Sequence, residues 1–267
     1  MDAFADARQY FAGADPDREF LRAMRDHLVK SLLERVTASS RRSLREPLII
    51  QRRMIEPMAE IVRLPVYQGQ YQTPTARELR RCGVSPLVTQ TFDRPIVFLD
   101  TSARGKEEQH GHGFINKLER DWIANACRIY ERELTGPDQV TVSILCFYLA
   151  QALEIRNRLK APRYPGFRRL AFERIDPIDK IQGQQSDIVF ISFCRSNPHP
   201  SKNFGQWLQD LRRLNVACTR ARRAVVLVGH REMLSKLHTF EGAQNFYGNL
   251  FSLFDASPDH FLHLKDF

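Results

Sequence analysis

The chain has 267 residues, which is enough for one large or two modest domains with an ample core. Its hydrophobic content of 43% and charged content of 27% are those of an ordinary soluble globular protein, and no apolar stretch approaches the ~18 residues of a membrane span. The formal net charge of +9 favours polyanionic partners, nucleic acid first, although a merely basic surface is the alternative.

The five cysteines are scattered and odd in number, and they include no C-x-x-C pair. This pattern argues against a disulfide framework or a zinc module and fits a reducing compartment. Because no charged-then-apolar signal opens the chain, we expect a cytoplasmic protein without a membrane partner.

The first 90 residues contain two candidate helices. Residues 17–36 carry apolar side chains at helical spacing and predict an amphipathic helix within a helical N-terminal segment, 1–46. Residues 47–64 predict a second helix, with Pro57 near its start or at a kink. The following segment, 66–75, is rich in Gln, Tyr and Gly and predicts a loop.

Four short apolar runs in the rest of the chain predict buried strands. They are rich in Val, Ile and Phe, and their apolar residues follow one another without the polar alternation of a sheet that exposes one face to solvent. They therefore suit a parallel sheet covered on both faces. The runs are Ile96–Leu99, Val142–Phe147, Ile188–Phe193 and Ala224–Val228. Helical patterns over 115–133, 148–160 and 206–222 lie between them, and this alternation predicts a doubly wound, mainly parallel α/β sheet. We expect an aromatic-rich extension, 241–267, to pack back on to the core.

Five arginines fall between positions 212 and 223, just before a predicted strand. Arg213 and Arg220 are seven residues apart, so in a helix over 206–222 they share a face. An arginine fork stays protonated and grips two phosphoryl oxygens, so this face suits a phosphate, and a solvated basic face is the alternative. A second polar segment brings Gln182 and Gly183 ahead of a buried strand, where backbone and amide groups can approach a ligand.

Together the two segments resemble motifs V and VI of superfamily 1 helicases, and most closely the superfamily 1B branch of the nonsense-mediated-decay RNA helicase. The family pattern V-D-x-x-Q-G-x-E-x-D is similar to Ile178–Asp187, and R-R-L-N-V-A-x-T-R-A-R matches Arg212–Arg222 almost letter for letter. Upstream, Gln51–Met54 resembles the Q-Y-R-M element, and Phe147–Gln151 resembles the T-P-Y-x-x-Q segment. The likeness spans about 31–235 in the family's own order, which is more specific than any single motif.

The resemblance implies the second RecA-like lobe of a helicase motor, over residues 47–240. In such motors ATP, with Mg²⁺, lies between two lobes, and the second lobe supplies an arginine finger. Arg220 matches the finger, and Arg53 matches the Q-Y-R-M arginine that approaches the γ-phosphate. The other residues that the resemblance places toward the nucleotide are Asp179, Gln182, Gly183, Gln185, Arg213 and Arg222. The implied partners are single-stranded DNA or RNA and a P-loop-containing lobe, in the same chain or in a separate one.

Several features depart from the family pattern. No G-x-x-x-x-G-K-[ST] occurs, because the only Gly-Lys pair, Gly105-Lys106, is followed by a glutamate rather than a hydroxyl residue. The motif V glutamate is Gln185, and the Q-Y-R-M aromatic is Arg52, both of which bear on nucleotide preference. We therefore expect little ATP hydrolysis by this chain alone. The alternatives are a non-catalytic helicase-derived module that binds nucleic acid or protein, and a remnant without function.

The remaining candidate residues carry weaker signals. His110 and His112 lack a third ligand at convincing spacing, so we expect a flexible loop there and no metal site in the chain. Asp100 is expected to be structural. Trp122 is expected in the core, and the aromatics that we expect to be exposed, without an assigned nucleic-acid contact, are Tyr67, Tyr71 and Trp207.

Overall fold

The structure is a computed structural model that describes residues 49–160, 166–181, 183–197, 205–239 and 245–267. The predicted helix over 17–36 lies outside these residues. Residues 49–267 form one compact unit. Among the described residues, no helix combines the length and the apolar character that crossing a bilayer requires.

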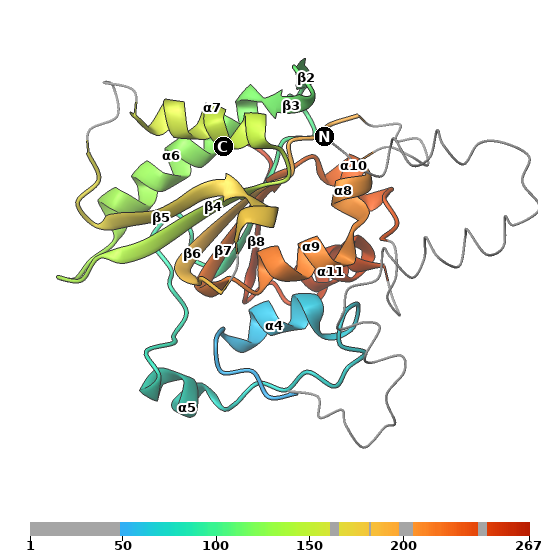
Figure 1. Ribbon diagram of the computed structural model, residues 1–267. Coiled ribbons are helices and arrows are strands. Elements are labelled where there is room, and N and C mark those ends of the chain that lie inside the picture. The colour runs from blue at the N-terminus through green and yellow to red at the C-terminus, as the bar shows by residue number, and fades with distance from the viewer. Residues whose placement is uncertain (1–48, 161–165, 182, 198–204, 240–244) are drawn as a thin grey trace, which may run out of the picture. The chain divides into compact units, whose positions relative to one another are not determined.

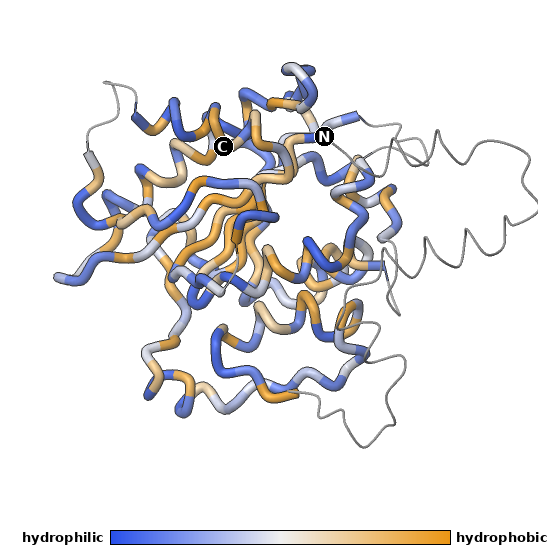
Figure 2. The backbone as a smooth tube through the Cα atoms, in the orientation of Figure 1, coloured by the Kyte–Doolittle hydropathy of each residue, from blue (hydrophilic) through white to orange (hydrophobic). Residues whose placement is uncertain are grey.

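A six-stranded, all-parallel sheet forms the centre of this unit, in the order β5-β4-β6-β7-β1-β8 (Figure 1). The strands are β1 (Ile96–Asp100), β4 (Val140–Cys146), β5 (Leu170–Pro177), β6 (Ser186–Ser192), β7 (Ala221–Gly229) and β8 (Phe261–Leu264). All four apolar runs of the sequence form strands of this sheet, so the predicted parallel α/β architecture is confirmed. The sheet is the most hydrophobic part of the chain in Figure 2.

Helices cover both faces of the sheet. One face packs against α6 (Lys117–Glu133) and α7 (Leu149–Lys160), and the other packs against α4 (Glu56–Arg63), α9 (Leu211–Cys218) and α11 (Phe246–Ala256). Successive residues of β7 show the alternation: Val225 and Leu227 join the core on the α9 side, whereas Val226 and Val228 join the core on the α6 side. Continuous apolar strands are therefore required by burial on both faces.

Two of the predicted helices are confirmed almost to their ends. The helix expected over 115–133 is α6, which begins after Asn116 because the side chain of Asn116 accepts a hydrogen bond from the amide of Glu119. The helix expected over 148–160 is α7. The helix expected over 47–64 is shorter, since α4 starts next to Pro57 and the preceding residues are extended, with Ile50 bridging Gln72.

The prediction of one helix over 206–222 is wrong. The structure has a short α8 (Gln206–Gln209), then α9, which ends at Cys218, and residues from Ala221 onward are strand β7. Asp210 is extended and caps α9 by accepting from the amide of Arg212. At the other end, Ser186 of β6 donates its amide to the Arg220 carbonyl, so sheet pairing takes over where the apolar helical pattern alone would continue.

The sequence patterns missed three strand regions. Strand β5 is an edge strand of mixed charged and apolar residues, and β8 is only four residues long, so neither has the apolar run of a central strand. The segment expected as a loop around His110 is instead a hairpin of β2 (Glu107–His110) and β3 (Gly113–Asn116), with Gly111 at φ +58° in its turn. The remaining elements are α5 (Ala76–Arg81), the single-turn η2 (Ile178–Lys180) and α10 (Arg231–Ser235).

Candidate phosphate-binding site

Arg53 and Arg220 come together at the edge of the sheet where β6 and β7 begin. The Oε1 atom of the buried Gln51 accepts from the backbone amides of Arg53 and Met54, at 2.9 Å each, which fixes the backbone of Arg53. The Arg53 Nη1 atom then donates to the Thr219 carbonyl at 3.0 Å. Arg220 follows directly, and its Nε atom donates to the Val216 carbonyl at 3.2 Å. Both guanidinium groups are thus attached to the last turn of α9.

Neither of these arginines pairs with an acidic residue in the part of the chain that the structure describes. Within the described residues, no carboxylate lies in ion-pair range of Arg53 or Arg220, although both side chains are partly buried. Burial and the nearby positive charge of Arg53 lower the pKa of Arg220. Two close, half-buried cations without a carboxylate are unfavourable by themselves, so the pair is suited to receive an anion with several oxygens.

Two stacked tyrosines adjoin the arginine pair. The rings of Tyr67 and Tyr71 lie 4.1 Å apart at an angle of 8°, and Asn215 of α9 donates to the Tyr67 hydroxyl at 3.3 Å. Burial, followed by the neighbouring Tyr67, raises the pKa of Tyr71 to about 12, while Arg53 and Arg220 act in the opposite direction. Tyr71 therefore stays neutral, and the two stacked rings border the arginine pair. The expectation that Tyr71 is exposed is wrong, since it retains only 9% exposure.

The loop before β6 supplies a backbone acceptor to the site. Gly183 has φ +74°, a conformation that favours glycine, and the carbonyl of the next residue, Gln184, accepts from the Arg220 Nη1 atom at 3.4 Å. Gly183 and Gln185 are exposed, and Gln182 lies outside the described residues. Gln184 was not among the predicted site residues, because a backbone carbonyl leaves no signal in side-chain identity.

The other predicted arginines are held elsewhere. Arg213 lies at the opposite end of α9 from Arg220, with its Nη1 atom 3.1 Å from a carboxylate oxygen of Asp179 and its Nε atom 3.5 Å from Asp210. Arg222 lies on β7, 3.5 Å from Asp187. The expectation that Arg213 and Arg220 share a helix face is therefore wrong, because α9 ends before Arg220. The structure brings together Arg53, Arg220 and the loop after Gly183.

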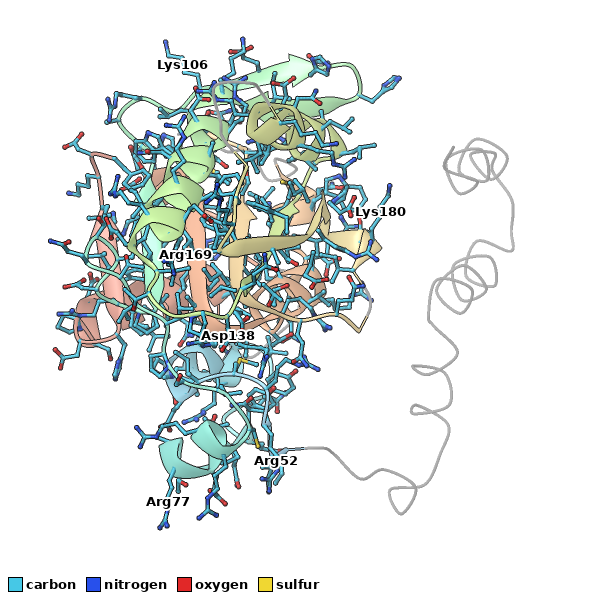
Figure 3. The ribbon with its side chains drawn as sticks, turned by 90° about the vertical axis from the view of Figure 1, so that its left-hand side faces the viewer. Arg52, Arg77, Lys106, Asp138, Arg169 and Lys180 are labelled. Atoms are coloured by element: carbon cyan, nitrogen blue, oxygen red, sulfur yellow. The ribbon has the colours of Figure 1, made fainter. Side chains whose placement is uncertain are left out.

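Basic side chains lie on several sides of the molecule. In Figure 3, Lys106 is at one end of the chain's compact unit, Arg52 and Arg77 are at the other, and Lys180 projects from a third side. Arg52 is exposed, so the substitution of the family aromatic does not add a cation to the pair formed by Arg53 and Arg220.

Across the residues that the structure describes, no three His, Cys, Asp or Glu side chains cluster as metal ligands would.

Comparison with known proteins finds one matching family and several similar proteins. Residues 28–232 match the AAA domain family. The chain is similar to a regulator of nonsense transcripts 1 homolog of Drosophila melanogaster, with 32% identity over 85% of this chain and 18% of the relative. It is similar to the ATP-dependent helicase upf1 of Schizosaccharomyces pombe, with 25% identity over 78% of this chain and 22% of the relative.

A third relative acts on DNA according to its name. The human DNA replication ATP-dependent helicase/nuclease DNA2 is 33% identical over 51% of this chain and 12% of its own length. The chain thus spans about a fifth or less of the length of these relatives. The matched region includes the arginine pair and the loop after Gly183 in the family match.

Proposed function

We propose that this chain, which belongs to the AAA domain family in the nonsense-mediated-decay branch of superfamily 1 helicases, acts as the second motor lobe of an ATP-driven nucleic-acid translocase. In this role it completes an ATP site whose other half is a P-loop lobe, in the same chain or in a separate one. Single-stranded DNA or RNA is the track.

The arginine pair is the observation that carries this proposal. Among the described residues, neither arginine has a carboxylate partner, and both donate to carbonyls in or next to the last turn of α9, which leaves both charges available for a terminal phosphate. A guanidinium at this place stabilises the charge that develops on a phosphoryl group during transfer. Arg220 is the proposed finger, and Arg53 is the proposed second contact to the γ-phosphate.

The residues present fit one part of an ATP–Mg²⁺ complex and not the rest. The arginines fit the terminal phosphate, and the exposed Gly183 and Gln185 border that place. The sequence has no P-loop to cradle the other phosphates, and the described residues hold no carboxylate cluster for Mg²⁺. The metal, when bound, neutralises phosphate charge. We infer that the partner lobe supplies its ligands.

The first test is an ATPase assay on this chain mixed with, or fused to, a P-loop lobe of the same helicase branch. We expect Arg220→Ala to lower nucleic-acid-stimulated ATP hydrolysis on the order of a thousandfold, because removal of an arginine finger costs that much in related enzymes. Arg77→Ala, which removes an exposed arginine of α5, is the matched control and should keep the rate of the unmodified chain. Equal rates for the Arg220 variant and the control would reject the finger.

A non-catalytic nucleic-acid-binding module is the second candidate. It is favoured by Gln185, which replaces the charged motif V residue and is exposed beside the site. This candidate predicts salt-dependent binding to single strands that ATP does not alter with any P-loop partner. The motor predicts that ATP or its analogues change the affinity.

A further inference from the structure

Trp207 is a large aromatic side chain that the arginine pair and the ATP site leave unexplained. The chain has two tryptophans. Trp122 is buried in the core at 5% exposure, whereas Trp207, on α8, is 50% exposed. Its neighbour Leu208 is completely buried, so α8 is anchored to the core while the indole faces outward.

The covered face of the indole rests on a fixed arginine. The Arg213 guanidinium carbon lies 3.9 Å from the centre of the Trp207 ring, which is a close cation–π contact. Two carboxylates hold this guanidinium, since Asp179 lies 3.1 Å and Asp210 lies 3.5 Å from its nitrogens. Arg213 is thereby neutralised and immobilised from two elements, η2 and the start of α9. Its role here is to support the ring rather than to bind phosphate.

We propose that Trp207 is a stacking platform for an unpaired base of single-stranded DNA or RNA, an inference that rests on the proposed nucleic-acid function. A flat ring with one face fixed and much of its surface exposed offers a base a preorganised π surface, and every base has a π face. Single-strand sites combine such rings with nearby cations that follow the backbone. Lys180 is exposed and follows Asp179 in η2.

The surrounding charge favours a nucleic acid over a protein as the occupant. The chain has a formal net charge of +9, and the two acidic residues that hold Arg213, Asp179 and Asp210, are paired with it. An approaching polyanion therefore meets the exposed Lys180, while Arg212 lies 3.5 Å from Asp210. An apolar protein segment would gain only the contact with the indole ring.

The position of Trp207 connects it to the arginine pair through one helix. Arg213 lies in the first turn of α9 and Arg220 lies just beyond its end, and eight helical residues span about 12 Å. A base on Trp207 and a phosphate at Arg220 would thus contact opposite ends of α9.

Tryptophan fluorescence tests the platform directly, because the exposed indole dominates any response to added ligand. The probes are oligo(dT), oligo(U) and an abasic phosphodiester of the same length, each titrated into the full chain with parallel fluorescence anisotropy of labelled strand. We expect both base-bearing probes to quench the emission and the abasic probe to leave it unchanged. Trp207→Leu should lose the quenching and bind oligo(dT) about 5- to 150-fold more weakly. This fold-change corresponds to a stacking energy of ~1–3 kcal/mol per base.

Two variants separate stacking from general effects on the surface. Trp207→Phe keeps an aromatic ring and should recover part of the affinity. Leu153→Ala removes a different exposed apolar side chain, 44% accessible on α7, and should bind like the unmodified chain. Thermal unfolding that matches the unmodified chain shows that the Trp207 variants remain folded.

Each outcome has a distinct meaning. Binding by anisotropy without quenching, or equal quenching by the abasic strand, overturns the platform and leaves the proposed nucleic-acid function intact. Absence of binding to every strand rejects both. Quenching by a helicase partner polypeptide and not by oligonucleotides would assign the ring to a protein interface and overturn the inference.

Discussion

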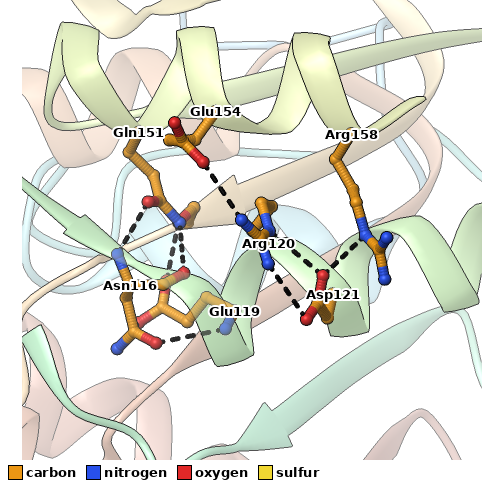
Figure 4. Close-up of polar contacts among 8 residues, drawn as sticks. Asn116, Glu119, Arg120, Asp121, Gln151, Glu154 and Arg158 are labelled. Atoms are coloured by element: carbon orange, nitrogen blue, oxygen red, sulfur yellow. Dashed lines mark hydrogen bonds and ion pairs between the residues drawn. The ribbon is translucent and has the colours of Figure 1, made fainter. Parts of the chain in front are cut away.

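At the scale of single residues, Glu119 is the most deeply buried charged side chain in the described part of the chain. Its carboxylate is fully buried and accepts from the Ser192 hydroxyl at 2.6 Å and the Cys194 amide at 2.8 Å. Asn116 and Gln151 complete a network that joins α6, α7 and the end of β6 (Figure 4). Burial raises the pKa of Glu119 to about 8, although these donors favour the carboxylate.

This raised pKa predicts a pH-dependent stability. The folded state holds a proton on Glu119 that the unfolded state releases near pH 4.5, so folding binds more protons between about pH 4.5 and 8. The stabilisation is fully present below that window and is lost as the pH rises through 8. We expect Glu119→Gln, which mimics the neutral acid, to remove this dependence, on the order of a few kcal/mol.

Urea unfolding at several pH values from 5 to 9 measures this effect as the difference in unfolding free energy between the unmodified chain and Glu119→Gln. That difference should shift in favour of the variant as the pH rises. Glu173→Gln, which alters an exposed glutamate on β5, should track the unmodified chain at every pH. A constant difference for Glu119→Gln would mean that the carboxyl stays ionised in the fold.

At the same scale, side-chain identity predicted some contacts of the candidate site and missed others. Arg53 and Arg220 lie far apart in sequence but adjoin in the structure, as the motif order implies. The stacked Tyr67 and Tyr71 could not be predicted, because stacking depends on how the loop after α4 folds back. The same holds for the support of Trp207, since its ring rests on Arg213, which Asp179 holds across a turn that has no sequence signature.

Elements at the margins of the sheet depend on specific polar contacts, and β8 shows this most clearly. It has four residues and, among the strands that the structure describes, pairs with β1 alone. His263 of β8 donates from Nε2 to Asp100 at the end of β1, at 3.0 Å, and its Nδ1 atom faces Arg231 at 2.9 Å. With Arg231 as donor, the neutral Nε2–H tautomer satisfies both contacts. Burial of Asp100 is outweighed by donors from His263 and Ser102, which lower its pKa.

We predict that His263→Ala loosens β8. Removal of the imidazole leaves the buried Asp100 carboxylate short of a donor, which should cost about 1–3 kcal/mol of unfolding free energy. Hydrogen exchange should accelerate in residues 261–264 more than in β6 or β7. His260→Ala removes an exposed imidazole three residues earlier and should change neither measurement. Uniform acceleration over the whole sheet would show that the contact stabilises the fold globally and not this strand.

Element boundaries also mark where sequence patterns stopped being informative. The apolar positions of α9 continue at helical spacing into Ala221, so periodicity alone extends the helix. Pairing of Ser186 with Ala221 overrides it, since a central strand satisfies all its backbone groups in the sheet. Strand β5 escaped notice for the opposite reason, because its charged residues at an edge mask the strand pattern.

At the scale of the whole molecule, the parallel arrangement of the central strands follows from rules that need few details. Continuous apolar runs require cover on both faces, and helices between them provide it with parallel strands. This much was predictable and is confirmed. The position of β8 beside β1, which continues the sheet beyond residue 240, was not, because pairing of a short terminal strand depends on Asp100 and Arg231 rather than on its own residues. The proposed boundaries at residues 46 and 240 remain predictions.

The distribution of thiols has a practical consequence for experiments on this chain. All five cysteines are in the described residues, and Cys82, at the end of α5, is the exposed one. Burial raises the pKa of the other four thiols, and it raises that of Cys218 to about 12. These four therefore remain unreactive thiols in the folded chain. A maleimide dye therefore attaches at one position without any prior mutation. Because the Cys82 carbonyl accepts from Arg222 at the start of β7, that dye reports on the edge of the sheet where β7 begins.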